Sequence, residues 1–314
     1  MPKTNCYHCK IPILMKPTIS VVISTHNRSR LLLLCLQGLV RQTINSAAYE
    51  IIVVDNHSTD DTKPAVADFI HKHPKFHIKY IYESKIGLSI ARNQGASHAV
   101  GKYLAFIDDD AQASPEWLKA ASLIVSDQKP DVFGGPIYPQ FASPPPNWFK
   151  PAYETRTHGP HQKILNHTEY LSGSNIFIKK SLFINIGGFN PRLGMSGSTR
   201  KFGEETFFQQ LARSRGHKVF YSPNLKITHH TPQFKTTLKY IFATHFQQGI
   251  DRSDQEHLIW WKHYPHAILA ICQILILSTF GLALRDRHQY PYYQQFLHDK
   301  IAPLFFWIGR IWHF

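Results

Sequence analysis

Cysteine is scarce in this chain of 314 residues, which contains only four. Four cysteines are too few for the disulfide framework of a secreted protein, so their number favours a reducing compartment. Cys6 and Cys9 form one C-x-x-C pair, but no second Cys or His pair follows at zinc-finger spacing, which argues against a zinc site. Cys35 and Cys272 lie in apolar runs and are predicted to be small buried hydrophobic residues.

A run of five or more consecutive Lys or Arg is also missing. The chain carries 35 Lys and Arg against 21 Asp and Glu, a formal net charge of +14, yet the basic residues are spread out rather than gathered into a tail. Such an excess favours anionic partners, whether nucleic acid, phosphorylated ligands or anionic lipid, without choosing among them. Residues 1–18 lack the apolar stretch of a signal peptide, so no secretory signal is expected.

The N-terminal half alternates between short apolar runs and longer amphipathic ones. Strands are predicted at runs rich in β-branched or aromatic residues that end in polar turns, namely Ile19–Ser24, Ile51–Asp55, Ile78–Tyr82 and Tyr103–Asp108. Helices are predicted between them, at residues 28–42 with Asn27 and Ser29 as capping candidates, at Lys63–His71, at Leu88–Val100 and from Ser114 onward. This alternation predicts an α/β fold with a Rossmann-like, mostly parallel sheet flanked by helices.

The second half gives weaker signals. Pro139–Pro151 is rich in proline and is predicted to be a long surface loop that forms a lid over the site. Helices are predicted at Glu204–Arg215, which Gly216 would end, and at Thr236–Gln248.

The composition changes again near the C-terminus. Ala267–Leu284 is an uncharged apolar run, and as a helix it would extend about 27 Å, slightly short of a typical hydrocarbon core. A spanning helix, an interfacial or re-entrant helix and a buried packing helix all remain open. The predicted organisation is an N-terminal extension (1–17), an α/β domain (18–250) and a C-terminal membrane-associated apolar helical tail (251–314).

Acidic residues follow two of the predicted strands. Asp55 ends one strand, and Asp108, Asp109 and Asp110 follow another. Ligands of parallel sheets lie beyond the carboxyl ends of the strands, so both groups are expected to face one crevice. Three adjacent carboxylates repel one another unless a cation offsets them, and on extended backbone Asp108 and Asp110 share a face while Asp109 points elsewhere. A solvated acidic loop is the alternative to a metal site.

Five motifs occur in order over roughly residues 18–250: ISVVISTHNR, EIIVVDNHSTDDT, GLSIARNQGASHAVGKYLAFIDDDA, GGF and GEETFFQQLARSRGH. With these motifs the chain resembles glycosyltransferase family 2. The resemblance implies the GT-A fold, an inverting transfer from a nucleotide-sugar donor, and Mn²⁺ or Mg²⁺ as the metal that neutralises the leaving diphosphate.

The resemblance also implies roles for residues on the donor side. Thr25, Asn27 and Arg28 match the segment that lines the nucleotide base pocket. Asp55 matches the aspartate that accepts a hydrogen bond from the base, typically uracil. Further donor-binding positions are implied for Arg92, Asn93, Asp108 and Asp109, with Asp108 matching the member of the D-x-D pair that faces the ribose.

The metal and the catalytic base are assigned in the same way. Asp110 matches the metal ligand, and His229 matches a histidine that joins the metal site in some relatives, although a structural histidine is the alternative. Glu204 and Glu205 match the acidic segment whose second member is the catalytic base, which makes Glu205 the predicted base. Because this chain has Glu where Asp is usual, Glu204 stays open as the alternative, and two acids also suit a helix N-terminus without any catalytic role.

The expected function is therefore transfer of a sugar, from UDP or another nucleoside diphosphate, to the hydroxyl of a saccharide or lipid-linked acceptor in polysaccharide or glycolipid synthesis. The chain is expected at the cytoplasmic face of a membrane, peripheral or with a single C-terminal membrane segment, and without a nucleic-acid partner. Two alternatives are an inactive membrane-surface scaffold of the same fold and a sugar nucleotidyltransferase. Residues Thr25–Arg28 contain no glycine, which argues against the glycine-rich first loop of a nucleotidyltransferase.

Overall fold

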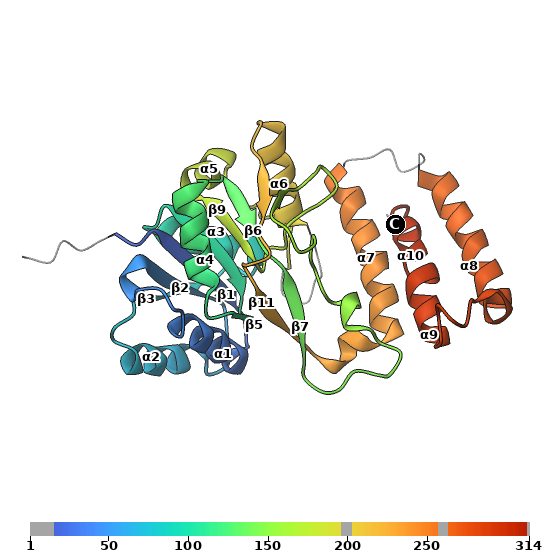
Figure 1. Cartoon of the computed structure of the whole chain (residues 1–314), viewed down its shortest axis with the longest axis horizontal. Helices are drawn as coiled ribbons and strands as arrows, with labels where there is room; N and C mark the ends of the chain where they lie inside the picture. The colour runs from blue at the N-terminus through green and yellow to red at the C-terminus, as the bar shows by residue number, and fades with distance from the viewer. Residues whose placement is uncertain (1–15, 196–202, 257–262, 313–314) are drawn as a thin grey trace, which may run out of the picture.

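The computed structural model describes residues 16–195, 203–256 and 263–312 (Figure 1). The chain forms an α/β body, and helices near its C-terminus pack beside that body. Cys6 and Cys9, nearly all of the expected N-terminal extension and residues 196–202 lie outside the described residues.

An eight-stranded sheet forms the centre of the body, in the order β3-β2-β1-β4-β9-β6-β10-β8. The four predicted strands pair in parallel as β1 (Ile19–Thr25), β2 (Tyr49–Asn56), β3 (Ile78–Glu83) and β4 (Tyr103–Asp108). The remaining strands are β6 (Val132–Gly134), β8 (Lys163–Ile164), β9 (Ile176–Lys179) and β10 (Val219–Tyr221). Because β9 runs antiparallel between β4 and β6, the latter two point in the same direction. The predicted α/β class with a mostly parallel sheet is confirmed.

Helices cover both faces of the sheet because its strands are apolar on both sides. Val21 belongs to a core formed with α1 (Ser29–Val40), α2 (Thr62–Lys72) and α4 (Trp117–Asp127). Its neighbour Val22 belongs to a second core formed with α3 (Leu88–His98), α5 (Lys180–Ile186) and α6 (Glu204–Ser214). Successive strand residues therefore serve opposite faces, as the two-residue period of a strand requires.

A smaller sheet of three strands, in the order β5-β11-β7, lies beside the end of β4. It contains β5 (Ala111–Ala113), β7 (Ile137–Phe141) and β11 (Ile227–Thr231), and it pairs His229 with Ala111. The prediction that Pro139–Pro151 is a loop is therefore wrong at its start, because Pro139–Phe141 pair with β11. The pairing places His229 next to the aspartates that precede β5.

The C-terminal helices are α7 (Leu238–Glu256), α8 (Tyr264–Leu284), α9 (Tyr293–Phe296) and α10 (Leu304–Gly309). Helices α7 and α10 cross at Gly249 and Gly309, where an added Cβ on either glycine would lie 2.1 Å from a carbonyl oxygen of the other helix. Any larger residue would push the helices apart. The boundary expected at residue 250 falls inside α7, because packing on α10 continues this helix beyond Gln248.

The segment from Trp148 to Tyr153 joins the body to the tail. Trp148, Phe149 and Tyr153 pack with Ile241 and Phe242 of α7 in one apolar cluster. The amide of Gln295 donates to the carbonyl oxygen of Trp148 at 2.9 Å. The proline-rich segment is therefore fixed to the tail, and its aromatic residues serve as packing contacts there.

Helix α8 is long and apolar enough to cross a membrane by length and composition, with a mean hydropathy of 2.3. Ala267, Ala270 and Gly281 face the neighbouring helices, whereas Leu275 and Phe280 are exposed. The alternative of a buried packing helix is wrong, because only 17% of its apolar window is buried. The prediction that Cys272 is buried is wrong for the same reason, whereas Cys35 is buried as predicted.

Candidate functional site

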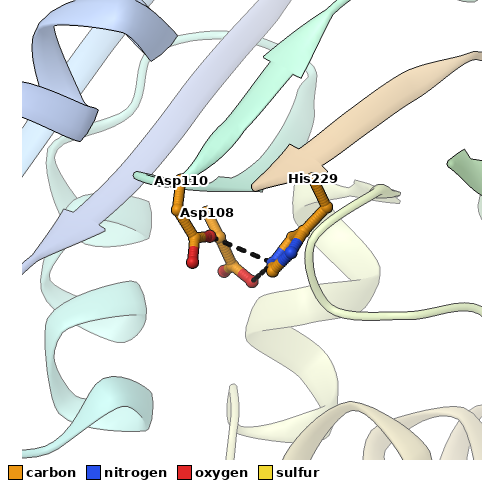
Figure 2. Close-up of side chains that lie close together, drawn as sticks. All are labelled: Asp108, Asp110 and His229. Carbon is orange, nitrogen blue, oxygen red and sulfur yellow. Dashed lines mark ion pairs between the residues drawn. The ribbon is translucent and has the colours of Figure 1, made fainter. Parts of the chain in front are cut away.

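Three ligand-type side chains converge beyond the end of β4. The Nε2 atom of His229 lies 3.0 Å from an oxygen of Asp110 and 3.8 Å from an oxygen of Asp108 (Figure 2). One ligand atom from each residue lies within 4.8 Å of the other two. Carboxylate and imidazole groups this close can hold a divalent cation.

The charges in this cluster are partly balanced by the protein itself. Burial would lower the pKa of His229, but hydrogen bonds to Asp108 and Asp110 and their charges raise it to about 9. Burial would raise the pKa of Asp108, yet the charge of Arg92 and the contact with His229 hold it below its usual range. The imidazole of His229 and the guanidinium of Arg92 thus both lie against the carboxylates of this cluster.

Asp109 points away from the cluster, as expected for the middle residue of the triplet. Its carboxylate accepts a hydrogen bond from the hydroxyl of Thr25 at 2.7 Å and lies 3.2 Å from Arg28. Burial raises the pKa of Asp109 to about 7, although the charge of Arg28 opposes this. The guanidinium of Arg28 also lies 3.3 Å from Asp110. It therefore bridges Asp109, which is buried, and Asp110, which belongs to the cluster with His229.

Asn27 stabilises a loop in place of the predicted helix cap. Its Oδ1 accepts hydrogen bonds from the backbone amides of Thr59 and Asp60, at 2.7 and 3.3 Å. Helix α1 begins after Arg28 without a side-chain cap, so neither Asn27 nor Ser29 caps it. The left-handed backbone of Asn27, with φ of 53°, turns its amide toward the loop that follows β2.

Asp55 lies at the same edge of the sheet but apart from the aspartate triplet. In the register of the strands it pairs with Thr25, while the adjacent Ser24 pairs with Asp108. Its side chain accepts hydrogen bonds from the hydroxyl of Tyr80 at 2.6 Å and from the amide of Ser58 at 2.9 Å. Tyr80 was not predicted as a site residue, because its place in the strand next to that of Asp55 was the only signal for it in the sequence.

Arg92 and Asn93 have different surroundings although they are adjacent. Arg92 is 3% exposed, and its two terminal nitrogens donate to Glu204 and Asp108, each at 2.7 Å. Asn93 instead exchanges two hydrogen bonds with the backbone of Phe189, at 2.8 and 2.9 Å. Gly188 must be glycine here, because its φ is +78° and a Cβ would lie 2.7 Å from the Asn93 oxygen. Asn93 therefore holds the turn after α5.

The two glutamates at the start of α6 also differ. Glu204 is 5% exposed and bound to Arg92, and its burial, together with the charge of Glu205, raises its pKa to about 8 against the effect of Arg92. Glu205 is partly exposed and lines an open pocket. Of the two, only Glu205 is free to face a bound molecule.

This pocket, called the Glu205 pocket below, brings together segments that are distant in sequence. Besides Glu205 and Thr206, its walls include Arg156, His158 and residues 170–172. None of these other wall residues was predicted individually from the sequence, because they lie in segments without a helix or strand period. Gly135, directly after β6, also lines the pocket, so the pocket opens at the edge where β4 ends.

Comparison with known proteins agrees with this arrangement. Residues 20–187, more than half of the chain, match the family model of glycosyl transferase family 2. The glycosyltransferase AglE of Haloferax volcanii is 27% identical over 181 residues, which cover 58% of this chain and 59% of AglE. The glucosyl-dolichyl phosphate glucuronosyltransferase of the same organism is 26% identical over 190 residues, 58% of each chain. The chain thus spans less than two thirds of the length of these relatives.

Among solved structures, a mannosyltransferase of Pyrobaculum calidifontis in complex with GDP-Man and Mn²⁺ has a TM-score of 0.63. The match covers 95% of this chain and 88% of that one at 16% identity, so it concerns the fold, which is of the GT-A type. The family model covers the region from β1 through β9 that carries the aspartate cluster. The chain belongs to glycosyltransferase family 2.

Proposed function

We propose that this protein is an inverting glycosyltransferase that moves a sugar from a nucleoside diphosphate, with UDP as the expected nucleotide, to an acceptor hydroxyl. One observation supports the proposal. Three groups lie one after another along a single edge of the sheet: an aspartate suited to binding a nucleotide base, a cluster of metal-ligand side chains, and a pocket lined by a glutamate. Asp55, the pair Asp108 and Asp110, and Glu205 occupy these three positions.

The chemistry of the cluster suits a resident Mn²⁺ or Mg²⁺. Asp110 and His229 would hold the ion, and Asp108, whose oxygen lies within the same cluster, would contribute to its site or face the ribose. When bound, such an ion supplies positive charge to a diphosphate leaving group. Next to the metal site, Thr25, Arg28 and Asp109 would line the site of the nucleotide. Asp55 would accept a hydrogen bond from the nucleotide base.

Glu205 is the proposed catalytic base. Its carboxylate takes the proton from the acceptor hydroxyl while that oxygen bonds to the anomeric carbon. The bond from this carbon to the diphosphate oxygen breaks at the same time, and its electron pair leaves with the nucleoside diphosphate. A single displacement of this kind inverts the anomeric centre. Glu204 is less suited to the role because Arg92 already binds it.

The acceptor side and the membrane complete the proposal. The exposed apolar surface of α8 is suited to contact with lipid, and residues 251–314 would keep the body, residues 18–250, at the cytoplasmic face of a membrane. The name of one relative describes a lipid-linked sugar as its substrate. We infer by this likeness that the acceptor is a glycolipid or a growing saccharide.

Thermal unfolding with nucleotides tests the proposal. A ligand that binds the native state raises the midpoint of unfolding, so UDP should raise it when Mn²⁺ is present and much less without the metal. The same experiment with GDP, ADP and CMP identifies the nucleotide. If no nucleotide raises the midpoint of a well-folded sample, the proposed activity is wrong and an inactive membrane-surface scaffold takes its place.

A further inference from the structure

The Glu205 pocket is lined on one side by Arg156, an exposed arginine. Within the described parts of the chain, Arg156 forms no side-chain hydrogen bond or ion pair, although it lines the same pocket as Glu205. Opposite charges that line one pocket without pairing leave room for a molecule between them. A ligand that fills this space would present a hydroxyl to Glu205 and negative charge to Arg156.

The wall that carries Arg156 is held in place by its backbone. The amide and the carbonyl of Arg156 each bond to Ile137 at the start of β7, both at 2.9 Å. Two residues further on, Nε2 of His158 donates to the carbonyl oxygen of Tyr170 at 3.0 Å. The backbone at Arg156 is thus fixed while its guanidinium remains available. Arginine presents a planar fork of N–H donors that matches a phosphate group.

The pocket is also joined to the tail. The chain runs from Ile137 through Trp148, Phe149 and Tyr153 to Arg156, and the three aromatic residues pack on α7. The ring of Tyr153 stacks on His298 with 3.7 Å between the ring centres. Arg156 therefore follows directly after the segment of residues 148–153, which contacts the C-terminal helices. The exposed apolar surface of α8 belongs to the same group of helices. This position suits an anionic group that enters from the membrane side.

We propose that Arg156 binds a phosphate group of the acceptor, so that the acceptor is a phosphate-bearing sugar whose reactive hydroxyl lies at Glu205. This inference rests on the proposed function, because it takes the Glu205 pocket to be the acceptor site. A lipid-linked sugar phosphate and a water-soluble sugar phosphate share the required chemistry.

The test uses three probes on the full chain: octyl phosphate, inorganic phosphate and octyl glucoside, each below its micellar concentration. EDTA is present so that no metal ion holds phosphate at the aspartate cluster. Binding is measured by calorimetry for the wild type, Arg156→Gln, Arg156→Lys and Arg41→Gln. Arg41 is an exposed arginine at the end of α1, at the opposite edge of the sheet, and serves as the matched control.

We expect octyl phosphate to bind more tightly than octyl glucoside, and Arg156→Gln to weaken octyl phosphate binding about tenfold. Arg156→Lys should retain part of the affinity, and Arg41→Gln all of it. If inorganic phosphate binds much more weakly than octyl phosphate, the natural ligand is a lipid-linked phosphate. If the two bind equally tightly, it is a water-soluble sugar phosphate. The inference is overturned if Arg156→Gln binds octyl phosphate as the wild type does, or if octyl glucoside binds equally well.

The result can be separated from that of the proposed function. Binding of UDP with Mn²⁺ is measured separately on the same variants without EDTA, and Arg156→Gln should bind it as the wild type does. If the protein binds UDP but its phosphate binding does not depend on Arg156, only this inference is wrong and the proposed function stands. If the protein binds octyl phosphate through Arg156 but binds no nucleotide, the anion site stands and the proposed transferase activity is wrong.

Discussion

The guanidinium of Arg92 donates a 2.7 Å hydrogen bond to the carboxylate of Glu204 in a site where both side chains are at most 6% exposed. The other end of the guanidinium binds Asp108, so one cation connects the start of α6 to the end of β4. Two carboxylates on elements far apart in sequence thus share one buried arginine. Glu205, the next residue of α6, is positioned by the same contact.

Replacing Arg92 should strongly destabilise the fold. Arg92→Gln leaves the buried carboxylate of Glu204 without its cation and removes one of the two basic side chains beside Asp108, and we expect the free energy of unfolding to fall by about 3–5 kcal/mol. Urea denaturation measures this loss. The double variant Arg92→Gln, Glu204→Gln should recover part of it, because one uncompensated charge is removed. Lys72→Gln, which breaks an exposed ion pair with Asp68, should cost less than about 1 kcal/mol, and an equal loss would contradict the buried bridge.

Replacing Asp110 should separate metal binding from folding. Asp110→Asn removes one carboxylate from the cluster, so stabilisation by UDP should no longer depend on Mn²⁺ while the urea midpoint stays close to that of the wild type. Thermal unfolding with and without Mn²⁺ measures both. Asp68→Asn, at an exposed position on α2, is the control and should keep the full metal effect. Metal-dependent stabilisation that survives in Asp110→Asn would remove Asp110 from the proposed site.

Glu205 and Glu204 should respond differently to the same change. Glu205→Gln should bind nucleotide normally and transfer sugar about 10²–10⁴-fold more slowly, because no base accepts the hydroxyl proton. Glu204→Gln should mainly lower stability, because it weakens the bond to Arg92. Release of UDP in the presence of acceptor measures transfer, with Glu116→Gln on the surface as control. If Glu204→Gln alone abolishes transfer in a folded sample, the two roles are exchanged.

Glu50 should make stability depend on pH. Burial would raise its pKa, but hydrogen bonds from Lys79, Ser20 and the amide of Val100 lower it from the ordinary 4.5. A lowered folded-state pKa stabilises the fold fully above the unfolded value, and this contribution is lost as the pH falls through the folded value. Glu50→Gln should therefore cost about 1–3 kcal/mol at pH 7 and progressively less below pH 4.5. Equal losses at pH 7 and pH 3, measured by urea denaturation, would exclude this ionic contribution.

Charge on α8 should detach the protein from lipid. Leu275 and Phe280 are 62% and 58% exposed, so replacing both by Arg should leave the packing of the body intact. Each arginine at the centre of a membrane helix costs about 2.5–3.5 kcal/mol, which should shift the chain from the vesicle pellet to the supernatant. Leu123→Arg on α4, 57% exposed, is the control and should stay with the vesicles. Sedimentation unchanged in the double variant would exclude α8 as the lipid contact.

The parallel half of the sheet was predictable from the sequence because each of its strands is a local apolar run that ends in a polar turn. The antiparallel direction of β9 was not, because direction depends on which distant strand it joins. The length of α7 was also missed, since its second half is stabilised by the crossing at Gly249 and Gly309 rather than by its own sequence.

The candidate site shows the same division. Alternation along extended backbone was enough to predict that Asp108 and Asp110 converge and that Asp109 turns away. The bridge from Arg92 to Glu204 was not predictable, because its partners lie 112 positions apart. The Glu205 pocket was missed for the same reason, as Arg156 and His158 reach it through loops. Exposure of Cys272 was missed because an apolar run does not reveal whether its side chains are buried or exposed.

The packing of Trp148, Phe149 and Tyr153 on the tail has a geometric consequence. A body fixed rigidly to a helix embedded in a bilayer is held at one height above the lipid headgroups. The Glu205 carboxylate would then select acceptors by distance, because only hydroxyls at a set distance from the bilayer surface would reach it. Selection by distance would favour acceptors of one length, and each sugar added would carry the chain end beyond the reach of the same enzyme.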